Sequence, residues 1–194
     1  MSGQRRAGFI VTLVILIGVL FIIGSWYINT RNRLITLEES INSAWAEIDN
    51  QLQRRSDLIP SLVNTVRGYA SHEQEVFTAI ADARARMAGA ESVQEAAEGY
   101  NEMQSALSRL MVVVEQYPDL KANESFIRLQ DELAGTENRI AVARRRYNEQ
   151  VRQFNTGIRT FPGSLFAGSL GLYQRDYFEI DESARTAPRV DFGS

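Results

Sequence analysis

The chain has 194 residues, a formal net charge of −3 and no cysteine. The lack of cysteine excludes disulfide bonds and thiolate metal sites. All 24 acidic residues and all but two of the 21 basic residues follow residue 28, so this larger part carries a formal charge of −5. Since non-specific nucleic-acid binding needs a basic face, we expect no nucleic-acid partner.

The first predicted element is a membrane anchor over residues 9–28, preceded by a short flank over residues 1–8. As a helix, twenty uncharged residues span about 30 Å, the thickness of the hydrocarbon core of a bilayer. Trp26 and Tyr27 lie at the end of this segment, and such amphipathic rings favour the headgroup level. A cleaved signal peptide is the alternative, but its apolar region is typically about 7–15 residues long and ends in a small-residue cleavage site. We therefore expect a single uncleaved span.

The sequence says little about which side of the membrane the larger part faces. Arg5 and Arg6 flank the span on one side, and Arg31 and Arg33 flank it on the other. The free amino terminus adds positive charge to the first side, and positive flanks favour the cytoplasm. This balance slightly favours a cytoplasmic amino terminus and an extracytoplasmic soluble domain.

From residue 34 onward, apolar residues recur every three to four positions, as on one face of a helix with near-heptad spacing. Arg55 interrupts this register. No glycine or proline occurs between Ser25 and Ile59, so one helix can continue from the bilayer into the polar part. Pro60 is expected to kink this helix without ending it, because the pattern continues beyond it. The stripe begins with Leu34, Leu37, Ile41, Ala44, Ile48 and Leu52.

Two capping boxes predict further helix starts. Ser71 with Gln74, and Ser92 with Glu95, fit the pattern of a serine followed three residues later by glutamate or glutamine. Gly89 fits a helix C-cap just before the second box. These signals predict one helix beginning near residue 71 and another beginning near residue 92.

The last long helix is predicted between two clear boundaries. Pro118 ends the preceding apolar stripe, and Asn123 is suited to cap the next helix. That helix stops between Gly157 and Pro162. Short connections make neighbouring helices antiparallel, so residues 29–160 are predicted to form an up-and-down bundle of three to four long helices. No segment alternates with a period of two, and the expected fold class is all-α.

The remaining segment, residues 161–194, is rich in glycine and aromatic residues and lacks a helical rhythm. Two explanations stay open: a loop packed back on the bundle, or a contact element for a partner subunit or the membrane. Its apolar area exceeds what a loop needs. Residues 181–194 are polar and are expected to be poorly ordered. The candidate contact residues are Leu165, Phe166, Leu170, Leu172, Tyr173, Tyr177 and Phe178.

We find no pattern that predicts catalysis. His72 is the single histidine, so neither a zinc H-E-x-x-H motif nor a pair of Glu-x-x-His motifs can be completed. No G-x-S-x-G elbow exists to expose a serine, and Lys121, the single lysine, lies in a predicted turn. We expect no enzyme activity, no cofactor and no metal site; a carboxylate-only metal enzyme is the least favoured alternative.

Two groups of charged and polar residues lie on the predicted helices. Surface ion pairs would explain them and contribute only a few tenths of a kcal/mol each. A buried polar network that fixes helix register is the functional alternative. The residues of this candidate cluster are Arg54, Arg55, Asp57, Glu137, Asn138 and Arg139.

Two long blocks of residues resemble the LemA family. The resemblance covers nearly everything after Leu34, and it implies a bacterial envelope protein with one N-terminal span, an antiparallel helical bundle and no established enzymatic activity. One branch of the family resembles a magnetosome membrane protein. The blocks include Ala44-Trp45, Arg54–Pro60, Gly68–Ala70, His72-Glu73, Leu120–Asn123, Thr136–Ala141, Tyr147-Asn148, Phe154-Asn155, Phe161-Pro162, Tyr177–Glu179 and Pro188–Phe192.

These observations lead to a functional hypothesis: a self-associating scaffold anchored in the bacterial inner membrane. Membrane lipid and further copies of the chain are the expected partners. Gly18 and Ser25 place small residues on one face of the span, where helices can approach closely. The runner-up is a monomeric adaptor that binds an envelope protease or another membrane protein.

Overall fold

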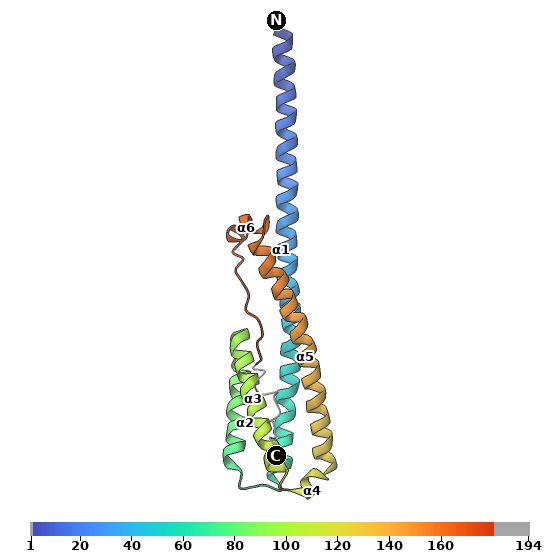
Figure 1. Ribbon diagram of the computed structural model, residues 1–194, viewed down its shortest axis with the longest axis vertical. Coiled ribbons are helices and arrows are strands. Elements are labelled where there is room, and N and C mark those ends of the chain that lie inside the picture. Colours follow the sequence, from blue (N-terminus) through green and yellow to red (C-terminus); the bar gives the residue numbers. More distant parts are fainter. Residues whose placement is uncertain (1, 181–194) are drawn as a thin grey trace, which may run out of the picture. The chain divides into compact units, whose positions relative to one another are not determined.

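The computed structural model describes the backbone of residues 2–180 and the side chains of residue 10 and residues 13–180. The prediction for residues 181–194 lies outside this part. The described residues form helices and no strand, which confirms the all-α class (Figure 1). The elements are α1 (Ser2–Arg67), α2 (Gln74–Ala88), α3 (Val93–Val114), α4 (Pro118–Lys121), α5 (Glu124–Arg159), α6 (Gly163–Phe166) and the 3-10 turn η1 (Gly168–Leu170).

The chain divides into two compact units, and α1 and α5 contribute to both. We call the described residues of 1–41 and 152–175 the anchor unit, and those of 42–151 and 176–194 the bundle unit. The boundaries at residues 28 and 160 that the sequence suggests follow a different criterion, the change in composition, and they stay a prediction.

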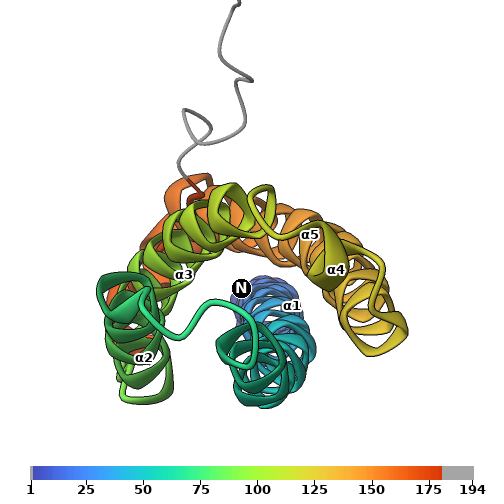
Figure 2. The same ribbon diagram turned by 90° about the horizontal axis from the view of Figure 1, so that it is seen from below.

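In the bundle unit, segments of α1, α2, α3 and α5 surround one apolar core (Figure 2). The apolar stripe of α1 supplies Ile59, Leu62 and Val66, all at most 1 % exposed. α2 and α3 follow each other through residues 89–92 and supply Ile80 and Met103. The three-to-four spacing of the apolar residues therefore marks the buried face of each helix.

The helix starts test the predicted capping boxes. At Ser92 the prediction is confirmed: the backbone N–H of Glu95 donates to the Ser92 hydroxyl at 3.1 Å. At Ser71 it is wrong, because α2 begins at Gln74 and its N-cap residue, Glu73, makes no side-chain capping bond. The Gln74 side-chain amide instead donates to the Ser71 carbonyl oxygen at 3.2 Å.

The other helix boundaries agree with the local signals. α1 continues through Pro60 to Arg67, as the uninterrupted stripe predicts. α3 ends before Pro118, which opens the short helix α4. The Asn123 side-chain oxygen accepts from the N–H groups of Ser125 and Phe126, at 2.9 and 3.1 Å, and caps α5 as predicted.

In the anchor unit, α6 turns back tightly after the end of α5. A Cβ atom placed on Gly163 would lie 2.0 Å from the carbonyl oxygen of Gly157, so this close backbone approach requires glycine. A Cβ on Gly157 would lie 3.3 Å from the side chain of Leu34 in α1. Small residues thus allow the end of α5 to pack against α1 and α6 to return beside it.

Candidate functional site

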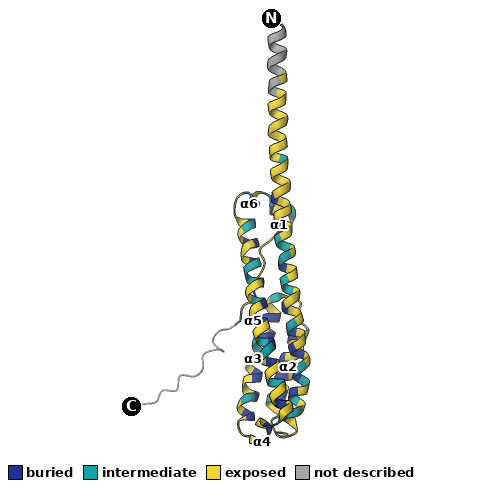
Figure 3. Ribbon diagram, turned by 90° about the vertical axis from the view of Figure 1, so that its right-hand side faces the viewer, coloured by how far each residue is buried: buried dark blue, intermediate teal, exposed yellow. Residues whose placement is uncertain are grey.

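The most apolar surface in the described part of the chain is the first half of α1. From Leu13 to Ile28 its large apolar side chains are 36–76 % exposed, and the helix is long and apolar enough to cross a membrane (Figure 3). Only 6 % of the apolar window is buried inside the protein. A core helix would be covered by its own chain, and this one is not. The surface matches a helix that meets lipid.

Gly18 and Ser25, the predicted small-residue contacts, lie on this helix. Both residues are exposed, and a Cβ atom on Gly18 would meet nothing of its own chain within 4 Å. Seven residues of an α-helix turn through nearly two whole turns, so the two positions share one face. This face is available for close approach by a second helix.

An aromatic cluster lies at the end of the apolar segment. The Trp26 ring contacts Phe161 and Phe166, with ring centroids 5.1 and 6.0 Å apart. The Tyr27 ring meets Phe166 edge-on at 5.0 Å. Tilted and edge-to-face geometries are the favourable ones for aromatic pairs. These contacts attach the turn around α6 to the last residues of the predicted span.

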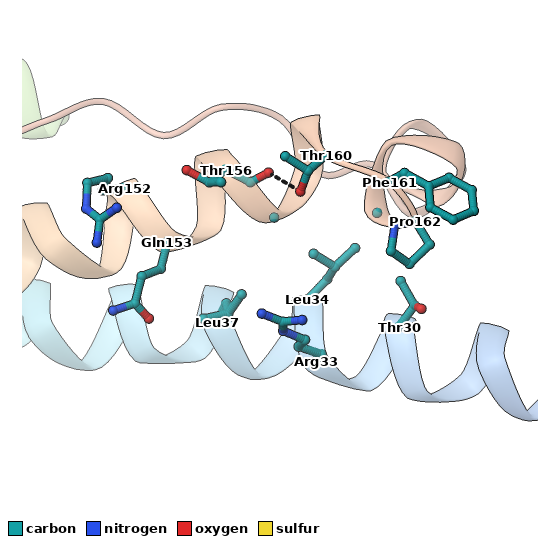
Figure 4. Close-up of a pocket in the computed structure, with 12 residues that line it drawn as sticks. Thr30, Arg33, Leu34, Leu37, Arg152, Gln153, Thr156, Thr160, Phe161 and Pro162 are labelled. Atoms are coloured by element: carbon teal, nitrogen blue, oxygen red, sulfur yellow. Dashed lines mark hydrogen bonds between the residues drawn. The ribbon is translucent and has the colours of Figure 1, made fainter.

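Below this cluster, the anchor unit contains a cavity of about 360 Å³ between α1 and the end of α5 (Figure 4). α1 lines it with Thr30, Arg33, Leu34 and Leu37. α5 and the turn that follows complete the wall, with Arg152 and threonines 156 and 160 among their residues. The lining contains two arginines and no acidic residue. The lining side chains therefore include basic groups and no acidic one, next to an apolar helix.

In the bundle unit, Arg55 is the charged residue at the centre of the predicted polar cluster. It is only 4 % exposed. Its guanidinium donates to the Leu133 carbonyl oxygen at 3.2 Å and to the Gln104 side-chain oxygen at 2.6 Å. It also pairs with the Glu137 carboxylate at 3.1 Å. A buried cation is tolerated only when it is paired and hydrogen-bonded in this way.

Tyr100 and Gln104, both on α3, complete this network. The Tyr100 hydroxyl donates to the Glu137 carboxylate, which also accepts from the Gln104 amide at 2.7 Å. The Arg55 guanidinium lies over the Tyr100 ring, 5.7 Å from its centroid. Burial, and then the hydrogen bond to Glu137, raise the pKa of Tyr100 well above its usual value. The network therefore joins α1, α3 and α5 through a neutral phenol and an ion pair.

The structure brings together two of the six residues proposed for this cluster. Arg54, Asp57, Asn138 and Arg139 are exposed on the helix surfaces, which is the surface explanation offered above. Asp57 accepts from the Gln53 amide at 3.0 Å, within one helix. Sequence reasoning missed Tyr100 and Gln104, because they lie more than 40 residues beyond Arg55.

The tail beyond η1 is held by two asparagine side chains of α5. In the anchor unit, the Asn155 amide donates to the Arg175 carbonyl oxygen and its oxygen accepts from the Arg175 N–H, both at 2.9 Å. In the bundle unit, Asn148 makes the same pair of bonds with Phe178, at 3.1 and 2.9 Å. Each asparagine amide therefore makes the two hydrogen bonds that a neighbouring strand would make, since it pairs with both the N–H and the C=O group of one tail residue.

The seven predicted tail contacts divide between the two open explanations. Phe178 is fully buried against the rings of Trp45 and Tyr100, and Leu172 is 8 % exposed. These two pack against their own chain. Phe166 and Leu170 are half-buried, whereas Leu165, Tyr173 and Tyr177 are exposed and available to a partner or to lipid.

Within the described residues, no group of three or more histidine or acidic side chains could hold a metal ion.

The LemA family model matches residues 44–192 of the chain. The chain is 26 % identical to Protein LemA of Metamycoplasma hominis, over 95 % of this chain and 83 % of that protein. It is 24 % identical to Magnetosome protein MamQ 2 of Paramagnetospirillum magneticum, over 76 % of this chain and 64 % of that protein. It is 23 % identical to Magnetosome protein MamQ of Magnetospirillum gryphiswaldense, over 91 % of this chain and 75 % of that protein.

Proposed function

The chain belongs to the LemA family, and from that premise we propose that it is a self-associating scaffold of the bacterial envelope, anchored in the inner membrane. The scaffold organises copies of itself and performs no catalysis. Its α1 helix crosses the membrane once, and the bundle unit lies on the extracytoplasmic side.

The observation that carries this proposal is the exposed first half of α1. Apart from the contacts of Trp26 and Tyr27, the described chain leaves these apolar side chains exposed, and lipid or other copies would cover them. Gly18 and Ser25 leave one side of this helix open for close packing. Relatives named for a magnetosome, and not for a reaction, fit an organising role.

Self-association is tested by mass photometry on the full chain in detergent and in lipid nanodiscs. We expect a discrete oligomer, and Gly18→Leu or Ser25→Leu should shift it towards smaller species because a bulky side chain holds the helices apart. Gly24→Leu is the matched control: it makes the same change about 120° around the helix from Gly18. A strictly monomeric wild-type chain contradicts the proposal.

The orientation is tested separately with a reporter enzyme that is active only outside the cytoplasm. Fused to the carboxyl terminus of the full chain, it should be active, because the apolar span places the two ends of the chain on opposite sides. An inactive reporter in cells that make the fusion stably would mean that the proposed orientation is wrong, and it would leave the proposed self-association unaffected.

A monomeric adaptor for an envelope protease or another membrane protein is the second candidate. The observation that favours it is the exposure of apolar side chains outside the span: Val112 on α3 is 66 % exposed and Tyr173 in the tail is 74 % exposed. Cross-linking in intact cells separates the two. Self-capture supports the scaffold, and a foreign protein at equal stoichiometry with a monomeric chain supports the adaptor.

A further inference from the structure

We propose that the cavity of the anchor unit binds the headgroup of an anionic phospholipid, taken from the leaflet where α1 leaves the membrane. This inference rests on the proposed function, in that it requires α1 to span the bilayer. It adds a lipid-binding site to the proposed scaffold: the cavity receives the lipid phosphate, and the exposed turn around α6 enters the boundary between headgroups and acyl chains.

The first step of the argument is depth. Trp26 and Tyr27 end the apolar segment, and such rings mark the headgroup level. Phe161 and Phe166 touch these rings, so they lie at the same level. Phe161 is 71 % exposed and Leu165 is 62 % exposed. Two large apolar side chains so exposed are unfavourable in water but favourable at the edge of the acyl layer.

The second step is the position of the cavity below that level. Thr30, the first lining residue of α1, is two residues beyond the end of the apolar segment, and Arg33 is five residues beyond it. At the helical rise, these positions lie about 3 and 7.5 Å outside the hydrocarbon. The headgroup layer on each side of a bilayer is roughly 5–8 Å thick. The part of the lining that α1 supplies therefore lies at the depth of the lipid phosphates.

The third step is charge. Although the chain after residue 28 is acidic overall, the cavity lining carries two arginines and no carboxylate. Arg33 is exposed on α1, so its guanidinium can reach a phosphate without breaking the fold. Three threonines, Thr30, Thr156 and Thr160, also line the cavity (Figure 4). The Thr160 hydroxyl donates to the Thr156 carbonyl oxygen at 2.9 Å and keeps its lone pairs for a lipid hydroxyl.

The fourth step is shape and polarity. A volume of about 360 Å³ accommodates a glycerophosphate headgroup but not a whole lipid. Leu34 and Leu37 line one wall and Pro162 lies towards the aromatic cluster. An apolar wall beside a cationic one suits the junction between a headgroup and the start of its acyl chains. A small soluble anion has no apolar part that could contact this wall.

The experiment measures lipid retention by native mass spectrometry on the full chain, purified with equal amounts of phosphatidylglycerol and phosphatidylcholine. We expect retained phosphatidylglycerol, and Arg33→Gln should lower the preference for it about tenfold, the effect of losing one charge-assisted hydrogen bond. Arg31→Gln is the matched control. It removes the same charge from an exposed position that does not line the cavity and points about 200° away, and it should change the preference less than about twofold.

Equal losses in the two variants, or none in either, would overturn the site, since general electrostatic attraction would then explain the preference. Release of phosphatidylglycerol from the wild type by inorganic phosphate or glycerol 3-phosphate would also overturn it, because the cavity would then bind free anions. Failure of the anchor itself is read out separately. Extraction of the reconstituted full chain from phosphatidylcholine vesicles by alkaline carbonate would refute the spanning helix, whereas retention with an unselective cavity refutes only the lipid site.

Discussion

Breaking the buried ion pair between Arg55 and Glu137 should destabilise the bundle unit in an asymmetric way. The Arg55 side chain is 5 % exposed and that of Glu137 is 26 % exposed. Replacing Glu137 by alanine leaves a nearly buried cation without its counter-charge. Replacing Arg55 by methionine leaves a carboxylate that water still reaches, and methionine keeps much of the arginine's apolar volume.

The magnitudes follow from these environments. Loss of one partner of a buried pair costs about 3–5 kcal/mol, and we expect Glu137→Ala at the upper end of that range. In Arg55→Met, Glu137 keeps its bonds from Tyr100 and Gln104, so the cost is about 1–3 kcal/mol. The double variant removes both charges. It should be more stable than the sum of the single effects predicts, with a coupling of about 1.5–3 kcal/mol.

The assay is urea unfolding of the full chain in a mild detergent, followed by tryptophan fluorescence in a Trp26→Phe background. Trp45 is then the sole tryptophan, and it reports on the bundle unit because its ring packs against Tyr147 and Phe178 at 5.7 and 6.0 Å. The exposed pair of Arg146 with Glu47, at 3.2 Å, is the control cycle. Its coupling should stay below about 1 kcal/mol, as for other exposed pairs.

Two results would refute this reasoning. Additive effects at positions 55 and 137, within about 0.5 kcal/mol, would mean that the two charges do not interact in the folded protein. A larger loss in Arg55→Met than in Glu137→Ala would mean that the difference in burial does not set the cost. Either result would remove the network as the feature that holds α1 against α5 in the bundle unit.

Three further outcomes are expected. The pKa of Tyr100 in the folded protein is raised, so the neutral phenol stabilises the fold fully below pH about 10. Above that pH the free energy of unfolding should fall by about 1.4 kcal/mol per pH unit. Urea unfolding between pH 8 and 11 should show this dependence, and the free energy of unfolding of Tyr100→Phe should depend less on pH. Gly99→Ala should destabilise the protein by about 1–3 kcal/mol, because the new Cβ would lie 2.9 Å from a backbone nitrogen of α2. Gly135→Ala should stabilise it by up to about 1 kcal/mol, because a Cβ there meets no atom within 4 Å and alanine favours a helix more than glycine does. Thermal unfolding of the two variants tests this difference. In a Trp45→Phe background, Trp26 should be quenched more by lipids brominated near the headgroup than by lipids brominated deep in the chain, and the reverse order would contradict its interfacial position.

Local signals in the sequence predict much of this fold. The long apolar helix that could cross a membrane follows from an uncharged stretch of sufficient length, and the caps at Ser92 and Asn123 follow from side chains that bond to nearby backbone N–H groups. The start of α2 fails the same reasoning because Glu73 occupies the N-cap without a capping bond. A sequence pattern identifies a cap only where a side chain makes it.

The candidate site is predictable only in part, because its residues meet across long separations. Arg55 interrupts an apolar stripe, and that register makes a buried network one of the two explanations that the sequence leaves open. Its partners come from other helices: Gln104 and Leu133 are 49 and 78 residues away. Likewise, the backbone of Phe178 pairs with the side chain of Asn148. Nothing periodic in an extended segment reveals such a pairing.

Polar contacts give the bundle unit something that its apolar stripes cannot supply. Stripes of near-heptad spacing look almost the same after a shift of seven residues, about 10.5 Å along a helix, so burial alone selects a register weakly. Such a shift would carry Arg55 away from Glu137 and the Leu133 carbonyl group and leave a buried charge unpaired, at a cost of several kcal/mol. Asn148 acts similarly on the tail, since a slip of one residue removes both of its bonds to Phe178. The buried arginine is therefore better explained by its effect on helix register than by stability, since an apolar residue of similar volume would often stabilise a core at least as well.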